Sequence, residues 1–175
     1  MRKRADGGCR PAANVQMATA GSPRGGPRTI VGVQVPNLGR DLRSIVPRLE
    51  QITLRTGERP KPLLADANQA AHDCIRIATE AGVEVLISVP TRSPNAGATA
   101  DLDPAIVAWR ERLTTAEATQ VYRARARLCE LTNAHLRRHH GVDPCLVRGL
   151  AKVTCVAVLG AIASNLLQHA TNLLA

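Results

Sequence analysis

Two carboxylates, Asp66 and Glu130, are the residues of this sequence best suited to chemistry. Asp66 follows a short apolar run, and Glu130 lies among arginines, three residues after Arg127. Phosphodiester chemistry on nucleic acids commonly uses carboxylates from separate segments to bind divalent metal ions, with cations nearby to receive phosphates. The sequence supplies two such carboxylates, whereas a complete site of this kind would require a third.

The distribution of charge predicts a polyanionic partner. The chain carries a formal net charge of +9, and residues 1–28 hold six Lys and Arg against one acid. Residues 29–109 hold eight against nine, and residues 110–175 hold nine against four. A neutral middle between two basic ends favours a nucleic acid as the partner. The alternative interpretation is a solvated, arginine-rich surface that binds nothing.

Length and composition predict one domain with an aliphatic core. A chain of 175 residues is close to the usual size of a single domain, and it contains no Phe, one Trp and one Tyr. Its five cysteines are odd in number and scattered, and no apolar stretch follows the basic first residues. We therefore expect a cytoplasmic protein without a disulfide framework. The longest apolar run, residues 153–163, is too short to span a bilayer and predicts a buried helix, with no membrane partner.

The first half of the chain predicts strands before helices. Residues 14–19 and 29–35 have strand-like patterns and are separated by a Gly- and Pro-rich loop, so we expect an antiparallel pair. Asp41 is placed to cap a helix that runs until Gly57, because apolar residues recur there at helical spacing.

The segment that contains Asp66 predicts a parallel sheet. Residues 62–67 and 83–89 have the composition of buried strands, and residues 70–81 between them have that of a helix. A strand, a helix and a second strand in this order imply a right-handed parallel crossover. Asp66 would then lie at the carboxyl end of a strand, where α/β sheets place their ligands. Its alternative role is to cap the following helix.

The second half of the chain predicts mainly helices. After a polar insertion at residues 91–104, a long helix can begin with Thr115 as its cap and run to about His140, and a final helix or pair covers residues 144–174. On the long helix, Glu130 shares a face with three arginines, Arg123, Arg127 and Arg137. The inward positions are Val121, Leu128, Leu131 and His135. A salt-bridged, solvent-exposed helix is the alternative interpretation of this stripe.

A zinc site is the weaker interpretation of a group of cysteines and histidines. The group consists of Cys129, His135, His139, His140 and Cys145. Its spacing matches no closed four-ligand pattern, although His135 and His139 are one helical turn apart.

Several motifs in a consistent order resemble the catalytic region of bacterial insertion-sequence DDE transposases. The likeness extends from about Gly7 to Leu174 and is strongest where Val-Arg-Gly-Leu-x-Lys-Val is followed by Asn-Leu. The motifs occupy residues 14–16, 30–33, 64–66, 122–126 with Glu130, 133–134, 146–153 and 164–166.

The resemblance implies an α/β fold, a ribonuclease-H-like mixed sheet flanked by helices with a long carboxyl-terminal helical region. It also implies two Mg²⁺ ions held by an Asp, Asp and Glu triad that cuts transposon ends and joins them to new DNA. By position, Asp66 corresponds to the second acid and Glu130 to the third, but Ala20 stands where the first is expected. The resemblance therefore predicts an incomplete metal site and impaired catalysis.

The resemblance also implies an organisation and a set of partners. Residues 1–28 form a basic lead-in with the first strand, and residues 29–175 form the remnant of a catalytic domain, from a truncated or degenerate copy. Double-stranded DNA at transposon ends is the expected partner, in the cytoplasm with the nucleoid, and the chain could form a homo-oligomer. The residues predicted to bind DNA are Arg123, Arg125, Arg127, Arg137, Arg138, Arg148 and Lys152. A non-catalytic DNA-binding or interaction module and an unrelated α/β enzyme are the alternatives.

Overall fold

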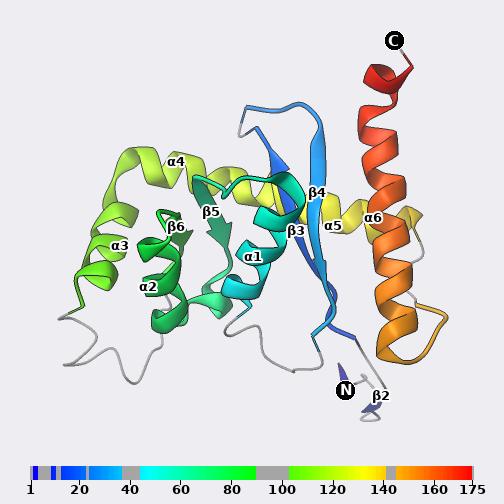
Figure 1. Ribbon diagram of the computed structural model, residues 1–175, viewed down its shortest axis with the longest axis horizontal. Coiled ribbons are helices and arrows are strands. Elements are labelled where there is room, and N and C mark those ends of the chain that lie inside the picture. Colours follow the sequence, from blue (N-terminus) through cyan, green and yellow to red (C-terminus); the bar gives the residue numbers. More distant parts are fainter. Residues whose placement is uncertain are drawn as a thin grey trace.

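The computed structural model describes residues 2–3, 9–10, 13–22, 24–36, 44–89, 103–140 and 145–174. Within these residues the protein has a mixed α/β architecture in which helices surround short strands (Figure 1). The elements are β1 (Arg2–Lys3), β2 (Cys9–Arg10), β3 (Gln16–Gly21), β4 (Arg28–Gln34), α1 (Ile45–Thr56), β5 (Pro62–Ala65), η1 (Ala67–Gln69), α2 (His72–Glu80), β6 (Glu84–Ile87), α3 (Pro104–Thr114), α4 (Ala116–Arg125), η3 (Ala126–Glu130), α5 (Leu131–His139) and α6 (Leu150–Leu173).

The predicted antiparallel pair is confirmed as the hairpin β3–β4. Met17 pairs with Val33 and Ala20 with Thr29, and the register shifts after Ala18. The connecting loop contains two glycines with positive φ, Gly25 and Gly26, a conformation that side chains with a Cβ atom rarely adopt. The turn chemistry therefore decides where the hairpin reverses.

The predicted strand–helix–strand unit is confirmed as β5, α2 and β6. The two strands are parallel, with Leu64 opposite Leu86. Helices α1, α2 and α3 pack on this unit and bury a cluster of apolar side chains. The cluster contains Ile45, Leu49, Ala65, Cys74, Ile75, Ala78, Val83, Val85, Ile87, Ile106 and Trp109. Aliphatic residues dominate it, as the composition predicts.

The continuous mixed sheet expected from the resemblance is not present among the described residues. Strands β3 and β4 form one two-stranded sheet, and β5 and β6 form another. A cavity of about 370 Å³, lined by residues of both β3 and β5, lies between them. No hydrogen bonds pair β3 with β5, so the two sheets remain separate.

Helix α3 was not predicted, because charged residues interrupt the apolar pattern of residues 105–114. Its start is nevertheless well specified, since Asp103 accepts a hydrogen bond from Ala105 N (2.9 Å) and Pro104 occupies the first turn. Its Trp109 is 1% exposed and donates from Nε1 to the carbonyl of Ile87 (3.1 Å). Residues 91–102, most of the predicted polar insertion, and Asp41, the predicted helix cap, lie outside the described residues.

The predicted long helix is confirmed as α4, η3 and α5 in succession (Figure 1). Thr115 caps it through its side-chain oxygen, which accepts from Ala118 N (3.2 Å). The segment η3 is π-helical, an irregularity that is frequent at functional sites.

The predicted inward face of this long helix is confirmed at Val121 and Leu128, which are half-buried and line a cavity, but not further along the helix. Leu131 is 40% exposed and His135 is also exposed, whereas Thr132 and Leu136 are buried. After η3 the true face is displaced by one residue, because the π-helical segment adds a residue to its turn and shifts every position that follows. The predicted outward residues are confirmed as exposed: Arg123, Arg127, Glu130 and Arg137.

Helix α6 packs along the outer edge of β4 (Figure 1). Its inward side chains join a second apolar cluster, which contains Ile30, Val33, Val35, Leu136, Val153, Ala157 and Ala161. Asn165 makes two hydrogen bonds with Ile30, accepting from its N–H (2.7 Å) and donating to its carbonyl (2.9 Å). The side-chain amide therefore replaces a neighbouring strand and protects the sheet edge.

The prediction that residues 153–163 form a buried helix is wrong for one face of α6. Leu159 is 60% exposed and Ile162 is 51% exposed. The apolar run at residues 153–163 is too short to span a bilayer, but it is only part of α6. The whole helix has 24 residues and is long and apolar enough to cross a membrane, judged by length and composition alone. Length and composition are weak evidence for a membrane span, because core helices of soluble proteins can be equally long and apolar.

Substitution of Asn165 by Leu is expected to lower the free energy of unfolding by about 1–3 kcal/mol, because it leaves the N–H and carbonyl of Ile30 without these partners. Urea denaturation followed by circular dichroism measures the loss. Asn172 is exposed on the same helix, so Asn172→Leu is the matched control, with an expected change within about 0.5 kcal/mol. Equal effects of the two substitutions would contradict the edge-protecting role.

Candidate active site

Asp66 directly follows β5, at the edge where the carboxyl ends of two parallel strands meet. Its carboxylate accepts a hydrogen bond from Ala67 N (2.8 Å) and another from the side-chain amide of Asn68 (3.4 Å). Asp66 therefore caps the short helix η1 and not the predicted helix after it, because the cap position of α2 is Ala71. The side chain is exposed, so capping does not remove its carboxylate from solvent.

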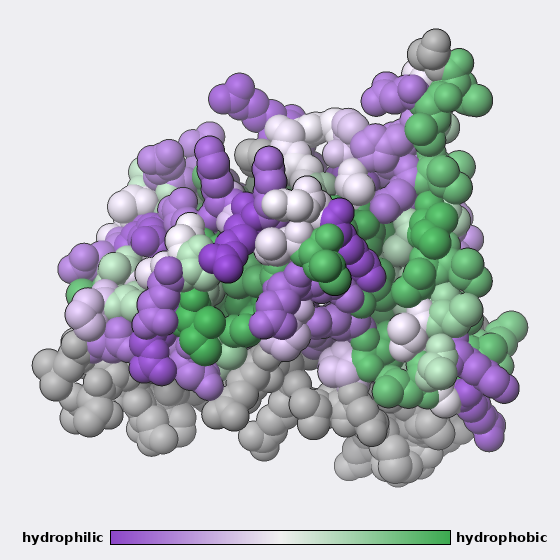
Figure 2. All heavy atoms as spheres, viewed as in Figure 1, coloured by the Kyte–Doolittle hydropathy of each residue, from purple (hydrophilic) through white to green (hydrophobic). Residues whose placement is uncertain are grey.

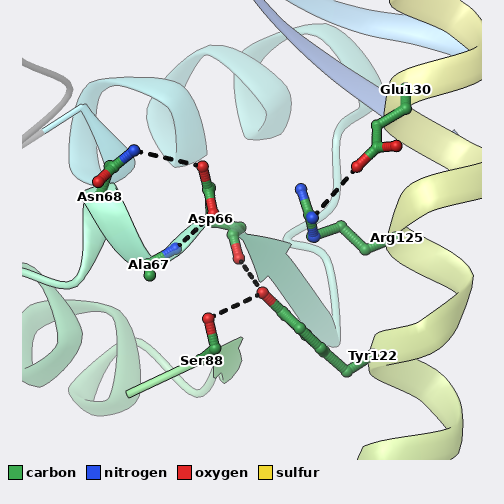
Figure 3. A network of polar contacts seen from close by, with 8 residues as sticks. Asp66, Ala67, Asn68, Ser88, Tyr122, Arg125 and Glu130 are labelled. Atoms are coloured by element: carbon green, nitrogen blue, oxygen red, sulfur yellow. Dashed lines mark hydrogen bonds and ion pairs between the residues drawn. The ribbon is translucent and has the colours of Figure 1, made fainter. Parts of the chain in front are cut away.

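Tyr122 anchors α4 against the strand ends beside Asp66. Its hydroxyl donates to the carbonyl of Ala65 (3.2 Å) and shares a hydrogen bond with Ser88 Oγ (3.2 Å) (Figure 3). Ala65 ends β5 and Ser88 follows β6, so this one side chain links both strands to the helix. Tyr122, the sole tyrosine of the chain, belongs to the motif at residues 122–126, but its role as an anchor was not predicted.

Glu130 forms an ion pair with Arg125, with 3.3 Å between Oε1 and Nη2. The guanidinium of Arg125 also lies 5.6 Å from the centre of the Tyr122 ring, a cation–π distance. Figure 3 shows that Arg125 extends from the helix into the region between Glu130 and Asp66. A cation of the protein itself therefore occupies the side of Glu130 that faces the strand ends.

The end of β3 packs against the same helical segment. Gly21 approaches η3 so closely that a Cβ atom added to it would lie 2.9 Å from Leu128 Cδ2. Ala20 precedes it and is exposed. The ends of β3 and β5 thus both meet the stretch of helix between Tyr122 and Glu130, which brings together the three chain segments that the resemblance singles out.

The cavity between β3 and β5 is lined by Ala20, Arg125 and Cys129 among others. Arg48 also lines it, is only 7% exposed, and donates hydrogen bonds to the side-chain carbonyls of Gln16 and Gln69. Burial raises the pKa of the Cys129 thiol above its ordinary value, although the charges of Arg125 and Arg48 act in the opposite direction. The thiol therefore stays protonated at neutral pH.

The residues predicted to bind DNA lie in two groups. Five of them follow the long helix, over about 22 Å from Arg123 to Arg138 at 1.5 Å per residue. Arg127 Nη2 donates to the carbonyl of Ser22 (3.3 Å), which brings the hairpin loop to this helix. Arg148 and Lys152 lie at the start of α6 and are exposed. Arg125 differs from the other six because it is half-buried and paired with Glu130.

The histidines considered for zinc do not combine with cysteine into a site in the described residues. The rings of His135 and His139 have centroids 5.8 Å apart, as expected for one helical turn, and both residues are exposed. In the part of the chain that the structure describes, no group of three or more His, Cys, Asp or Glu side chains could hold a metal ion.

The carboxyl-terminal part of the chain carries the decisive similarity to known proteins. Residues 98–170 match the family model of the transposase DDE domain. The match covers 73 of the 175 residues and includes α3 to most of α6, with Arg125 and Glu130. It confirms the resemblance over these residues and is consistent with the carboxyl-terminal region of a DDE transposase. Asp66 and Ala20 precede the matched segment. Neither the curated proteins nor the solved structures gave a match.

The described side chains do not fit the two-metal site that the resemblance to the transposase DDE domain implies. Figure 3 shows Arg125 between Asp66 and Glu130, and Asp66 caps η1 while Glu130 is paired with Arg125. Ala20 has no metal-binding atom in its side chain. A pair of divalent metal ions would need at least one carboxylate ligand besides Asp66 and Glu130. The arrangement can bind anionic groups through its arginines more readily than it can bind Mg²⁺.

Proposed function

We propose that this protein is derived from an insertion-sequence transposase and binds double-stranded DNA, but is impaired in metal-dependent strand cleavage and transfer. The observation that carries the proposal is the convergence of β3, β5 and the helical segment before Glu130, with Ala20 at the end of β3. The match to the transposase DDE domain supports the transposase origin. The convergence is also what a ribonuclease-H-like arrangement would require of these segments.

In this proposal the surviving carboxylates and the arginines have different roles. Asp66 and Glu130 are the remaining members of the acidic triad, and Arg125 forms an ion pair with Glu130. The exposed cations contact DNA phosphates, which contribute affinity without sequence information. These cations are Arg123, Arg127, Arg137, Arg138, Arg148 and Lys152. Binding to chromosomal DNA would place the protein in the cytoplasm with the nucleoid.

The principal alternative is a non-catalytic DNA-binding or interaction module. The Arg125–Glu130 ion pair favours it, because a functioning metal site would not keep a guanidinium against one of its ligands. An unrelated α/β enzyme has less support, because the similarity over residues 98–170 points to transposases.

Nicking of supercoiled plasmid DNA in the presence of Mg²⁺ or Mn²⁺ tests the proposal. The unaltered protein is expected to produce no nicked circles above a protein-free control. Ala20→Asp restores a carboxylate at the end of β3, where the residue is exposed and has room for it, and is expected to gain metal-dependent nicking.

The matched control is Ala20→Asn, which has nearly the same shape as Asp but no charge. It is expected to stay inactive. Nicking by the unaltered protein would overturn the claim of impairment. Equal inactivity of the Asp and Asn variants, both folded by circular dichroism, would show that the residue at this position is not what limits the reaction.

A further inference from the structure

Helix α6 has an apolar face that nothing in the described structure covers. Figure 2 shows this face as a column of hydrophobic side chains along the whole helix at the right of the molecule. Its centre is formed by Leu159, Ile162, Leu166 and Leu173, which are between 51% and 64% exposed. Leu167 and Leu174 lie beside them and are 69% and 88% exposed. Such a continuous exposed stripe marks an interaction surface rather than scattered surface leucines.

The spacing of this stripe is that of a helix-pairing seam. The residues at its centre follow one another at intervals of three, four and seven, and exposed Cys155 precedes Leu159 by four. The interval of seven passes over His169, which hydrogen-bonds to Thr29 of β4. Alternating intervals of three and four residues keep one apolar line along a helix that packs against another helix. The opposite face of α6 contains the buried Val153, Ala157, Gly160, Ala161 and Ser164. The helix therefore has one face for its own fold and one for a partner.

We propose that the partner is a second copy of this chain, bound by antiparallel pairing of the two α6 helices about a twofold axis. The six exposed side chains present on the order of 400–600 Å² of apolar surface. Because roughly 57–65% of an interface is apolar, this corresponds to the approximately 800 Å² that each partner contributes to a standard interface. The stripe is self-complementary, as a twofold interface requires.

Charge also favours a second copy and the antiparallel direction. Residues 153–174 contain no Asp, Glu, Lys or Arg, so two stripes can meet without like charges although the chain carries +9. The nearest cations, Arg148 and Lys152, lie at the start of α6. Parallel pairing would bring these cations of both copies together, whereas antiparallel pairing separates them and also aligns the helix dipoles favourably.

A membrane is a poorer partner for this helix. Asn165, Gln168 and His169 of α6 hydrogen-bond to β4, at distances between 2.7 and 3.3 Å, and the buried face packs in the second core cluster. Insertion across a bilayer would break these contacts and leave the edge of β4 without them. Pairing of two copies keeps them intact.

Sedimentation equilibrium tests the interface. The unaltered protein is expected to show a concentration-dependent species of twice its 18.6 kDa mass. Leu166→Glu is expected to weaken the association at least about a hundredfold, because it would place a charge at the centre of the seam of each copy. The side chain is 56% exposed, so the unfolding transition of the monomer should be unchanged. Leu54→Glu is the matched control, since Leu54 is 86% exposed on α1 and should not affect the mass.

Oxidative crosslinking tests the direction of the helices. In an antiparallel pair centred between Ile162 and Leu166, Cys155 of one copy lies opposite position 173 of the other. Leu173→Cys is therefore expected to form an intermolecular disulfide with Cys155, identified by peptide mass spectrometry. A Cys155–Cys155 disulfide in the unaltered protein would overturn the antiparallel arrangement.

Three outcomes would overturn the second copy as the partner: a monomer at all concentrations, a dimer that Leu166→Glu does not weaken, or binding of the monomer to phosphatidylcholine vesicles. DNA binding does not enter these measurements, so the inference stands or fails independently of the proposed function.

Discussion

The affinity of the protein for duplex DNA is expected to fall about a thousandfold between roughly 50 and 200 mM salt. Six cations of the set predicted to bind DNA are exposed, and each contact with a phosphate contributes about −0.9 to the slope of log affinity against log salt, which gives a slope near −5. Fluorescence anisotropy with a labelled duplex over a series of salt concentrations measures this slope.

Substitutions on the long helix refine the result. The double substitution of Arg137 and Arg138 by Gln is expected to make the slope less steep by about 2. Arg125→Gln is expected to change it less than Arg123→Gln, because Arg125 is paired with Glu130. Arg76 on α2 is 51% exposed and lies near Asp103, so Arg76→Gln is the matched control and should leave the slope unchanged. An affinity independent of salt would contradict DNA binding and favour a small-molecule enzyme.

Substitution of Trp109 by Ala is expected to lower the free energy of unfolding by about 3–5 kcal/mol, the usual cost of truncating a buried large aromatic side chain. Trp109 is 1% exposed and joins α3 to the core between α2 and β6. The substitution also leaves the Ile87 carbonyl without its donor. Because domains are stable by only about 5–15 kcal/mol, this is a large part of the total. Urea denaturation followed by circular dichroism measures the change, since the sole tryptophan is removed.

Trp109→Phe separates packing from hydrogen bonding. It keeps most of the apolar volume but loses the indole N–H, so its expected cost is about 1–3 kcal/mol. A loss below about 1 kcal/mol for Trp109→Ala would contradict the central position of this side chain in the core.

Local patterns in the sequence were sufficient for most elements. The hairpin β3–β4 was predictable because its β-branched run is bounded by glycines and prolines, and the parallel β5–α2–β6 unit because its elements alternate in type. The start of the long helix was predictable from Thr115, whose side chain can accept a backbone hydrogen bond. In each case the signal lies within a few residues, so no distant part of the chain has to be known.

Features that depend on distant contacts were not predictable. The two sheets are separate, and a cavity is lined by residues of both β3 and β5, an arrangement that no local pattern indicates. The inward face of the long helix was misplaced after η3, where Thr132 and Leu136 are buried instead of Leu131 and His135, because a regular helical period does not anticipate a π-helical turn. The exposed face of α6 was misjudged because apolar composition does not distinguish a helix that is buried on all sides from a helix with one exposed apolar face.

For the candidate site, the sequence by itself determined which groups are available: Asp66 after a strand, Glu130 on a helix, and no acid at Ala20. Only the tertiary structure decided what surrounds them, because the ion pair of Glu130 with Arg125 and the contact of Tyr122 with Ala65 depend on how the helix lies on the strands. Chemical identity is a property of single residues. Proximity is a property of packing, which brings together groups that are more than fifty residues apart.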